Sequence, residues 1–134
     1  MTPRPRVLIA SHDREAVDQL RMLLDARGYR TEVERTGPAL LERARSAPPA
    51  AIIASVRLPR LNGYELLCAV RADSALAKTP VLLLSDVTTE SGTTDAEWAR
   101  LTEATAFFTE PMDPEALLGA LSAALGPQSP SASN

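Results

Sequence analysis

Short apolar runs alternate with longer amphipathic segments along this 134-residue chain. Three runs, at residues 7–10, 50–54 and 81–84, are almost wholly apolar, which is typical of strands buried on both faces of a sheet. Residues 29–34 alternate Tyr, Thr and Val with charged side chains and predict a half-exposed strand. A further strand is expected at residues 106–108, which brings the predicted strands to five.

The segments between these runs carry apolar side chains three and four positions apart, as amphipathic helices do. The first helix begins after Asp13, which we expect to cap it, and ends before Gly28, a residue typical of helix C-termini. The last helix begins at Pro114, with Asp113 as its N-cap. Further helices are expected at residues 38–47, 64–72 and 96–104, the last of them short and preceded by a long polar loop.

Strand and helix thus alternate five times, which predicts a five-stranded parallel sheet with helices on both faces, a doubly wound α/β domain of three layers. In such sheets the functional crevice lies beyond the carboxyl ends of the strands, where the strand order reverses. Polar residues that directly follow the strands are therefore candidates for a site. They are Ser11, His12, Asp13, Ser55, Ser85, Asp86 and Glu110.

Composition limits the classes of function that this chain can have. Hydrophobic residues make up 45% of it, enough for the core of one domain over residues 1–126, before a Pro/Ser-rich tail at 127–134 that is expected to be disordered. A net charge of −3 and a pI near 5.2 argue against nucleic acid as a direct partner. The apolar run after the N-terminus is too short for a signal peptide or a membrane span. The single cysteine, Cys68, is expected as a reduced core residue in a cytoplasmic protein.

Several motifs resemble the receiver domain of bacterial two-component response regulators. They are the buried run at residues 6–10, the Pro-x-x-x-Gly-x-Glu-Leu-Leu segment within 58–67, and residues 79–85 and 107–112. The likeness extends from Arg6 to about Leu125 and implies a flavodoxin-like or CheY-like (βα)5 fold.

The resemblance also implies a phosphorylation site. In receivers, two acidic residues after the first strand hold Mg²⁺, and an aspartate after the third strand accepts the phosphoryl group. A hydroxyl after the fourth strand and a lysine after the fifth contact its oxygens. On this chain the acidic pair falls on Ser11 and His12, the acceptor on Ser55, the hydroxyl on Ser85, the lysine on Glu110 and the family's switch aromatic on Phe107.

Among these polar roles, only the hydroxyl at Ser85 is kept. Ser55 has no carboxylate and cannot form an acyl phosphate. Glu110 places a negative charge where a phosphoryl group needs a positive one, a reversal that costs on the order of several kcal/mol in a partly desolvated site. The chain is therefore similar to pseudo-receivers, also called aspartate-less receivers. This implies a phosphorylation-independent protein-interaction module in bacterial signal transduction, with no enzymatic activity and no cofactor.

Receivers usually meet partners, or a second copy, through the fourth helix, the fifth strand and the fifth helix. Here the resemblance assigns that surface to Trp98, Leu101, Phe108 and Leu118. Trp98 is either an exposed hot spot of this surface or a side chain packed on the sheet. Phe107 lacks a tyrosine hydroxyl and is expected to be buried and fixed, without a phosphorylation-driven switch.

Two alternatives concern the crevice itself. His12, together with Asp13, Asp86 and Glu110, could hold a divalent transition metal, or it is simply a loop histidine. Arg57 either pairs with Glu110 or is solvated. The alternative function is accordingly a regulator that responds to a small ligand or a metal bound in the degenerate crevice.

Overall fold

The computed structural model describes residues 4–58, 60–85, 105–109 and 113–125. The expected loop at 86–95, the helix at 96–104 and the tail at 127–134 lie outside the described residues. The elements follow one another as β1 (Arg6–Ala10), α1 (Arg14–Ala26), β2 (Arg30–Glu34), α2 (Gly37–Ser46), β3 (Ala51–Ser55), α3 (Gly63–Ala72), β4 (Val81–Ser85), β5 (Ala106–Thr109) and α5 (Pro114–Leu125).

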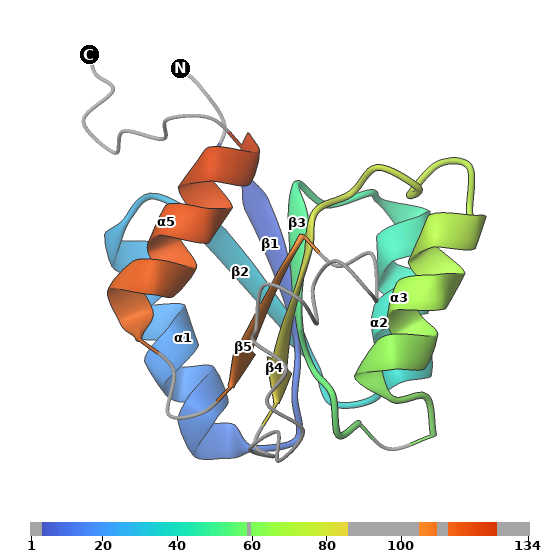
Figure 1. Ribbon diagram of the computed structural model, residues 1–134, viewed down its shortest axis with the longest axis horizontal. Helices are drawn as coiled ribbons and strands as arrows, with labels where there is room; N and C mark the ends of the chain where they lie inside the picture. The colour runs from blue at the N-terminus through green and yellow to red at the C-terminus, as the bar shows by residue number, and fades with distance from the viewer. Residues whose placement is uncertain (1–3, 59, 86–104, 110–112, 126–134) are drawn as a thin grey trace.

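The five strands form one parallel sheet in the order β2-β1-β3-β4-β5, so the predicted doubly wound α/β fold is confirmed. Helices α1 and α5 cover one face, and α2 and α3 cover the other (Figure 1). From β1 the chain adds β2 on one side and then crosses back to add β3 on the other side, so the strand order reverses between the adjacent strands β1 and β3. Loops that follow these two strands therefore meet at the carboxyl end of the sheet, where ligands bind in folds of this kind.

Successive residues of the central strands point into two separate cores. On the α2–α3 side, Leu8, Ile52 and Leu83 belong to one buried cluster, and on the α1–α5 side Ile9 and Ile53 belong to the other. Because both faces are covered, β1, β3 and β4 are apolar almost throughout. Strand β2 is at the edge and is only half buried, as its alternating pattern predicts.

Side-chain caps explain where the helices begin. The Asp13 carboxylate accepts hydrogen bonds from the backbone N–H groups of Glu15 and Ala16, so the predicted N-cap of α1 is confirmed. Asn62 and Glu65 form a reciprocal capping box at the start of α3. Helix α1 stops just before Gly28, whose φ of 93° suits a residue without a side chain.

The prediction that Cys68 is a core residue is wrong, because its side chain is exposed on α3. The face that α3 turns toward the sheet carries Leu66, Leu67 and Val70, and the helical period places position 68 on the opposite side.

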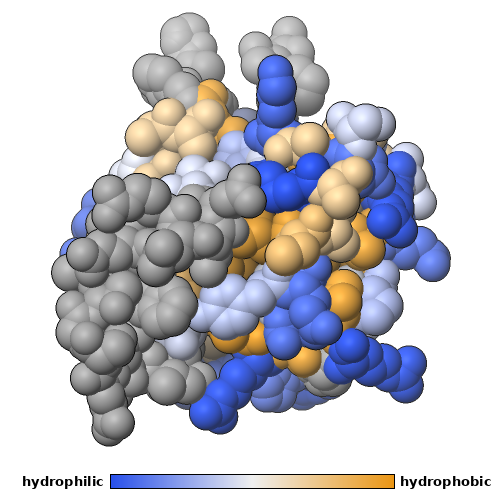
Figure 2. All heavy atoms as spheres, turned by 45° about the vertical axis from the view of Figure 1, so that its right-hand side comes forward, coloured by the Kyte–Doolittle hydropathy of each residue, from blue (hydrophilic) through white to orange (hydrophobic). Residues whose placement is uncertain are grey.

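Figure 2 turns the α2–α3 side toward the viewer and shows hydrophilic side chains around its margin, with hydrophobic surface between them. Within the described ranges, no helix has the length and apolar character that a membrane span requires.

Candidate functional site

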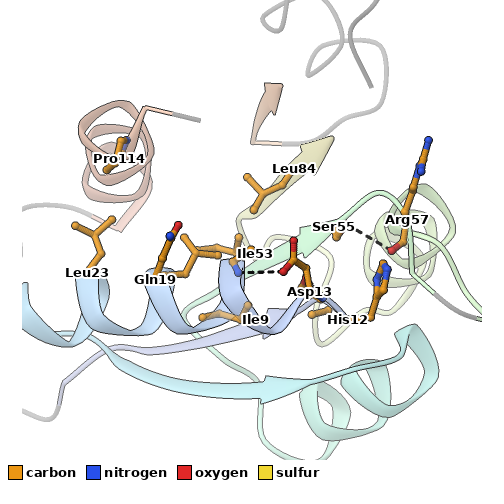
Figure 3. A pocket seen from close by; sticks show the side chains of 14 residues that line it. Ile9, His12, Asp13, Gln19, Leu23, Ile53, Ser55, Arg57, Leu84 and Pro114 are labelled. Atoms are coloured by element: carbon orange, nitrogen blue, oxygen red, sulfur yellow. Dashed lines mark hydrogen bonds between the residues drawn. The ribbon is translucent and has the colours of Figure 1, made fainter. Parts of the chain in front are cut away.

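The loops after β1 and β3 form one side of a pocket of about 530 Å³ at the carboxyl end of the sheet (Figure 3). The structure brings five of the candidate residues together there. They are Ser11, His12, Asp13, Ser55 and Arg57.

The residues after β1 serve the local structure of the chain. Ser11 is only 6% exposed, and its Oγ accepts a hydrogen bond of 3.1 Å from the backbone N–H of Asp13. Asp13 in turn caps α1, while the His12 side chain is exposed to solvent. The two positions that correspond to the acidic pair of receivers thus carry an engaged hydroxyl and an exposed imidazole.

Ser55 ends β3 and is partly buried. Its Oγ donates a long hydrogen bond of 3.5 Å to the carbonyl oxygen of Arg57, two residues further on. The chain then turns tightly, and the N–H of Gly63 donates to the carbonyl oxygen of Val56. A Cβ at position 63 would lie 2.7 Å from the Ser55 carbonyl oxygen, so this close approach requires a glycine.

Ser85 and Phe107 are buried, and neither lines the pocket. Ser85 ends β4 at 5% exposure. Phe107 on β5 is 4% exposed, so its expected burial is confirmed. Its ring stacks on that of Tyr64 from α3, with 6.4 Å between the ring centroids and 14° between the ring planes. Burial raises the pKa of the Tyr64 hydroxyl.

Four of the remaining candidates, Asp86, Trp98, Leu101 and Glu110, lie outside the described residues. So does the expected pairing of Arg57 with Glu110. Leu118, expected on the partner surface, is only 6% exposed and packs with Leu117 and Leu121 against the sheet. That placement was wrong because Leu118 shares the apolar face of α5 with its neighbours. Phe108 is partly buried and packs against the same cluster.

The residues that could hold a metal ion do not form a ligand set in the described part of the chain. No group of three His, Cys, Asp or Glu side chains comes together there. The hypothesis of a metal site that includes Asp86 and Glu110 depends on positions that the structure does not describe.

The rest of the pocket is apolar except for Gln19, and the sequence patterns did not indicate that it belongs to the site. Helix α1 contributes one wall, and Leu84 and Pro114 approach from the other side (Figure 3). The sequence pattern assigns Leu20 and Leu23 only to the apolar face of α1. One residue could have indicated the pocket from the sequence: Ala16, near the start of that face, is small and leaves space beside the helix. The lining residues beyond those of the two loops are Ile9, Ala10, Ala16, Gln19, Leu20, Leu23, Ile53, Leu84 and Pro114.

Comparison with known proteins agrees with this architecture. Residues 7–122 match the family described as the response regulator receiver domain. The chain is 27% identical to protein PilH of Pseudomonas aeruginosa over 120 residues, covering 90% of this chain and 97% of PilH. It is also 27% identical over 124 residues to the DNA-binding response regulator MtrA of Mycobacterium tuberculosis, of whose length the match covers only 52%.

Solved structures show the same fold. The chemotaxis response regulator CheY4 of Vibrio cholerae is 29% identical, with a TM-score of 0.78 over 91% of this chain and 99% of that chain. A putative response regulator from Chloroflexus aurantiacus has a TM-score of 0.81 at 24% identity, over 91% of this chain and 98% of that chain. The parallel sheet has the strand order of this fold and a crevice at its carboxyl end. Because the family match also covers residues 7–122, this chain belongs to the response regulator receiver domains.

Proposed function

We propose that this receiver domain is a phosphorylation-independent protein-interaction module in bacterial signal transduction, and that it is not an enzyme. The observation that carries the proposal is Ser55 at the carboxyl end of β3, the position of the phosphoacceptor in receivers. A serine hydroxyl has no carboxylate with which to form an acyl phosphate. This chain would therefore fall among the pseudo-receivers.

The residues after β1 support the same proposal. Mg²⁺ prefers oxygen ligands, chiefly carboxylates and water, and the two corresponding positions here are Ser11 and His12. The Ser11 hydroxyl is already bonded to the Asp13 amide and is almost fully buried. By sequence, Glu110 adds a negative charge where receivers carry a lysine. A phosphoryl group at this site would therefore lack both the Mg²⁺ ion and the lysine contact that it has in receivers.

The surface that binds the partner would keep one conformation, whether or not the conditions favour phosphorylation. Phe107 is buried against Tyr64 and has no hydroxyl to exchange between an inner and an outer position. We expect the surface that the family resemblance assigns to Trp98, Leu101 and Phe108 to bind a cytoplasmic protein partner or a second copy in one constant state. Leu118 is left out of this surface because of its burial.

A quantitative pull-down from a lysate of the source bacterium tests the proposal. Recovery of a specific partner should be the same with and without acetyl phosphate and Mg²⁺, and should fall for Trp98→Ala. Met22→Ala serves as the matched control, since Met22 is an exposed hydrophobic residue on α1 and is not one of the residues of the proposed surface. Recovery that rises on treatment with acetyl phosphate would speak against the proposal.

A further inference from the structure

The pocket at the carboxyl end of the sheet extends well beyond the position of the lost acceptor. Its volume of about 530 Å³ lies within the range of about 300–1,000 Å³ that is typical of small-molecule sites. The extension runs along α1, between this helix and the beginning of α5.

Apolar side chains line this extension on opposite sides. Ala16 and Leu23 belong to α1, Leu84 to the end of β4 and Pro114 to the first turn of α5. In Figure 3, Leu23, Gln19, Leu84 and Pro114 stand around a common hollow. Such a lining favours an apolar body, because burying apolar surface provides most of the affinity for small ligands.

A carboxylate lies where the apolar part meets the two loops. Asp13 lines the pocket, and its Oδ1 accepts hydrogen bonds from two backbone N–H groups of α1. Within the described residues, no hydrogen bond or ion pair involves Oδ2 of Asp13, which leaves this oxygen available to a ligand. Arg57 also lines the pocket, but Figure 3 shows its guanidinium group directed away from the hollow.

We propose that this pocket binds an amphipathic cation, with an apolar body along α1 and an ammonium group at Oδ2 of Asp13. An anionic head group is disfavoured there, because the inward-facing charge is negative and so is the net charge of the chain, −3. This site does not depend on phosphorylation, so its failure in a test would leave the proposed function intact.

Amide chemical shifts of the full chain report the binding directly. The probes are phenylpropylamine, phenylpropanol and phenylpropanoate, which share one apolar body and differ in the charge of the head group. The amine should produce saturable shifts at Ala16, Gln19 and Leu23. It should bind about twofold to fivefold more tightly than the carboxylate, the ratio expected of an exposed ion pair.

Variants separate the two parts of the site. Ala16→Leu should fill the apolar extension and weaken all three probes, and Gln19→Phe is a second blocking variant at an exposed position of the same wall. Asp13→Asn should abolish only the preference for the amine, because asparagine also caps helices well. Met22→Ala, on α1 but outside the lining, should bind like the wild type. The proposal is overturned if no probe shifts these amides at millimolar concentration, or if the carboxylate binds best.

Discussion

Single residues decide the chemistry of this domain. The difference between a serine and an aspartate removes the carboxylate at position 55, the acceptor position of receivers, and with it the group that forms an acyl phosphate there. The backbone around that position keeps a tight loop all the same, with Gly63 held against the Ser55 carbonyl. At this scale, the prediction that the acceptor is lost rests on the sequence alone, because it depends only on which atoms the side chain of residue 55 contains.

The loop after β3 also contains a strained residue. Arg60 has a φ of 71°, a left-handed conformation that costs an L-residue with a Cβ about 1 kcal/mol and that asparagine tolerates better. Arg60→Asn should therefore raise the free energy of unfolding by about 0.5 kcal/mol, and the β-branched Arg60→Val should lower it by about 1 kcal/mol.

Urea unfolding of the full chain measures both changes. Arg35→Asn is the control, because Arg35 is an exposed loop residue without a positive φ. Equal stability of Arg60→Asn and Arg60→Val would show that the left-handed conformation is not the cause.

Pairs of elements are held together by contacts that the helical and strand patterns do not reveal. The hydrophobic periodicity predicts which residues of α3 and β5 are apolar, but it does not tell that Tyr64 and Phe107 stack on each other. The errors at Cys68 and Leu118 have another cause, because the helical period itself places Cys68 opposite the apolar face of α3 and Leu118 on the apolar face of α5. Cys68 was assigned to the core from the apolar run around it, and Leu118 was assigned to the partner surface from the family resemblance.

The stacked pair links α3 to β5. A double-mutant cycle with Tyr64→Leu and Phe107→Leu should give a coupling free energy of about 0.5–1.5 kcal/mol, the usual value for an aromatic pair beyond its burial. Thermal or urea unfolding of the four proteins provides the measurement. Strictly additive effects would mean that the two rings contribute only through buried area.

Charged side chains join the edge strand β2 to its neighbours. Glu32 accepts from Arg6 of β1 at 3.0 Å and from Arg43 of α2 at 3.2 Å, and Arg43 also pairs with Glu34. Burial by itself would raise the pKa of Glu32. The hydrogen bonds and positive charges of Arg6 and Arg43 outweigh it and hold this pKa below its ordinary value of 4.5.

A lowered carboxyl pKa stabilises the fold above the ordinary value, and this stabilisation is lost as the pH falls through the lowered one. Glu32→Gln should thus be less stable than the wild type at pH 7, by up to about 1 kcal/mol because the pair is partly solvated. The difference should shrink as the pH falls below 4.5.

Urea midpoints at several pH values test this dependence. The control is Glu42→Gln, an exposed position on the same helix as Arg43. A difference between Glu32→Gln and the wild type that stays constant down to the lowest pH would rule out the ion pairs as its source.

At the scale of the whole molecule, the fold followed from alternation and burial. Apolar runs such as 81–84 gave the central strands, and strand–helix alternation gave the parallel sheet. The size of the pocket could not be predicted, because it depends on how far α1 stands from Pro114 and Leu84, distances that no local pattern encodes. The proposed loss of phosphorylation chemistry therefore follows from residue types, whereas the proposed ligand site follows from three-dimensional packing.

The most direct test of this account is intact-mass spectrometry after treatment with acetyl phosphate and Mg²⁺. A restored variant that combines His12→Asp, Ser55→Asp and Glu110→Lys is the positive control for the reaction. The account predicts that the wild-type chain gains no phosphoryl group under conditions in which the restored variant does. An acid-labile phosphoryl group on the wild-type chain would contradict it.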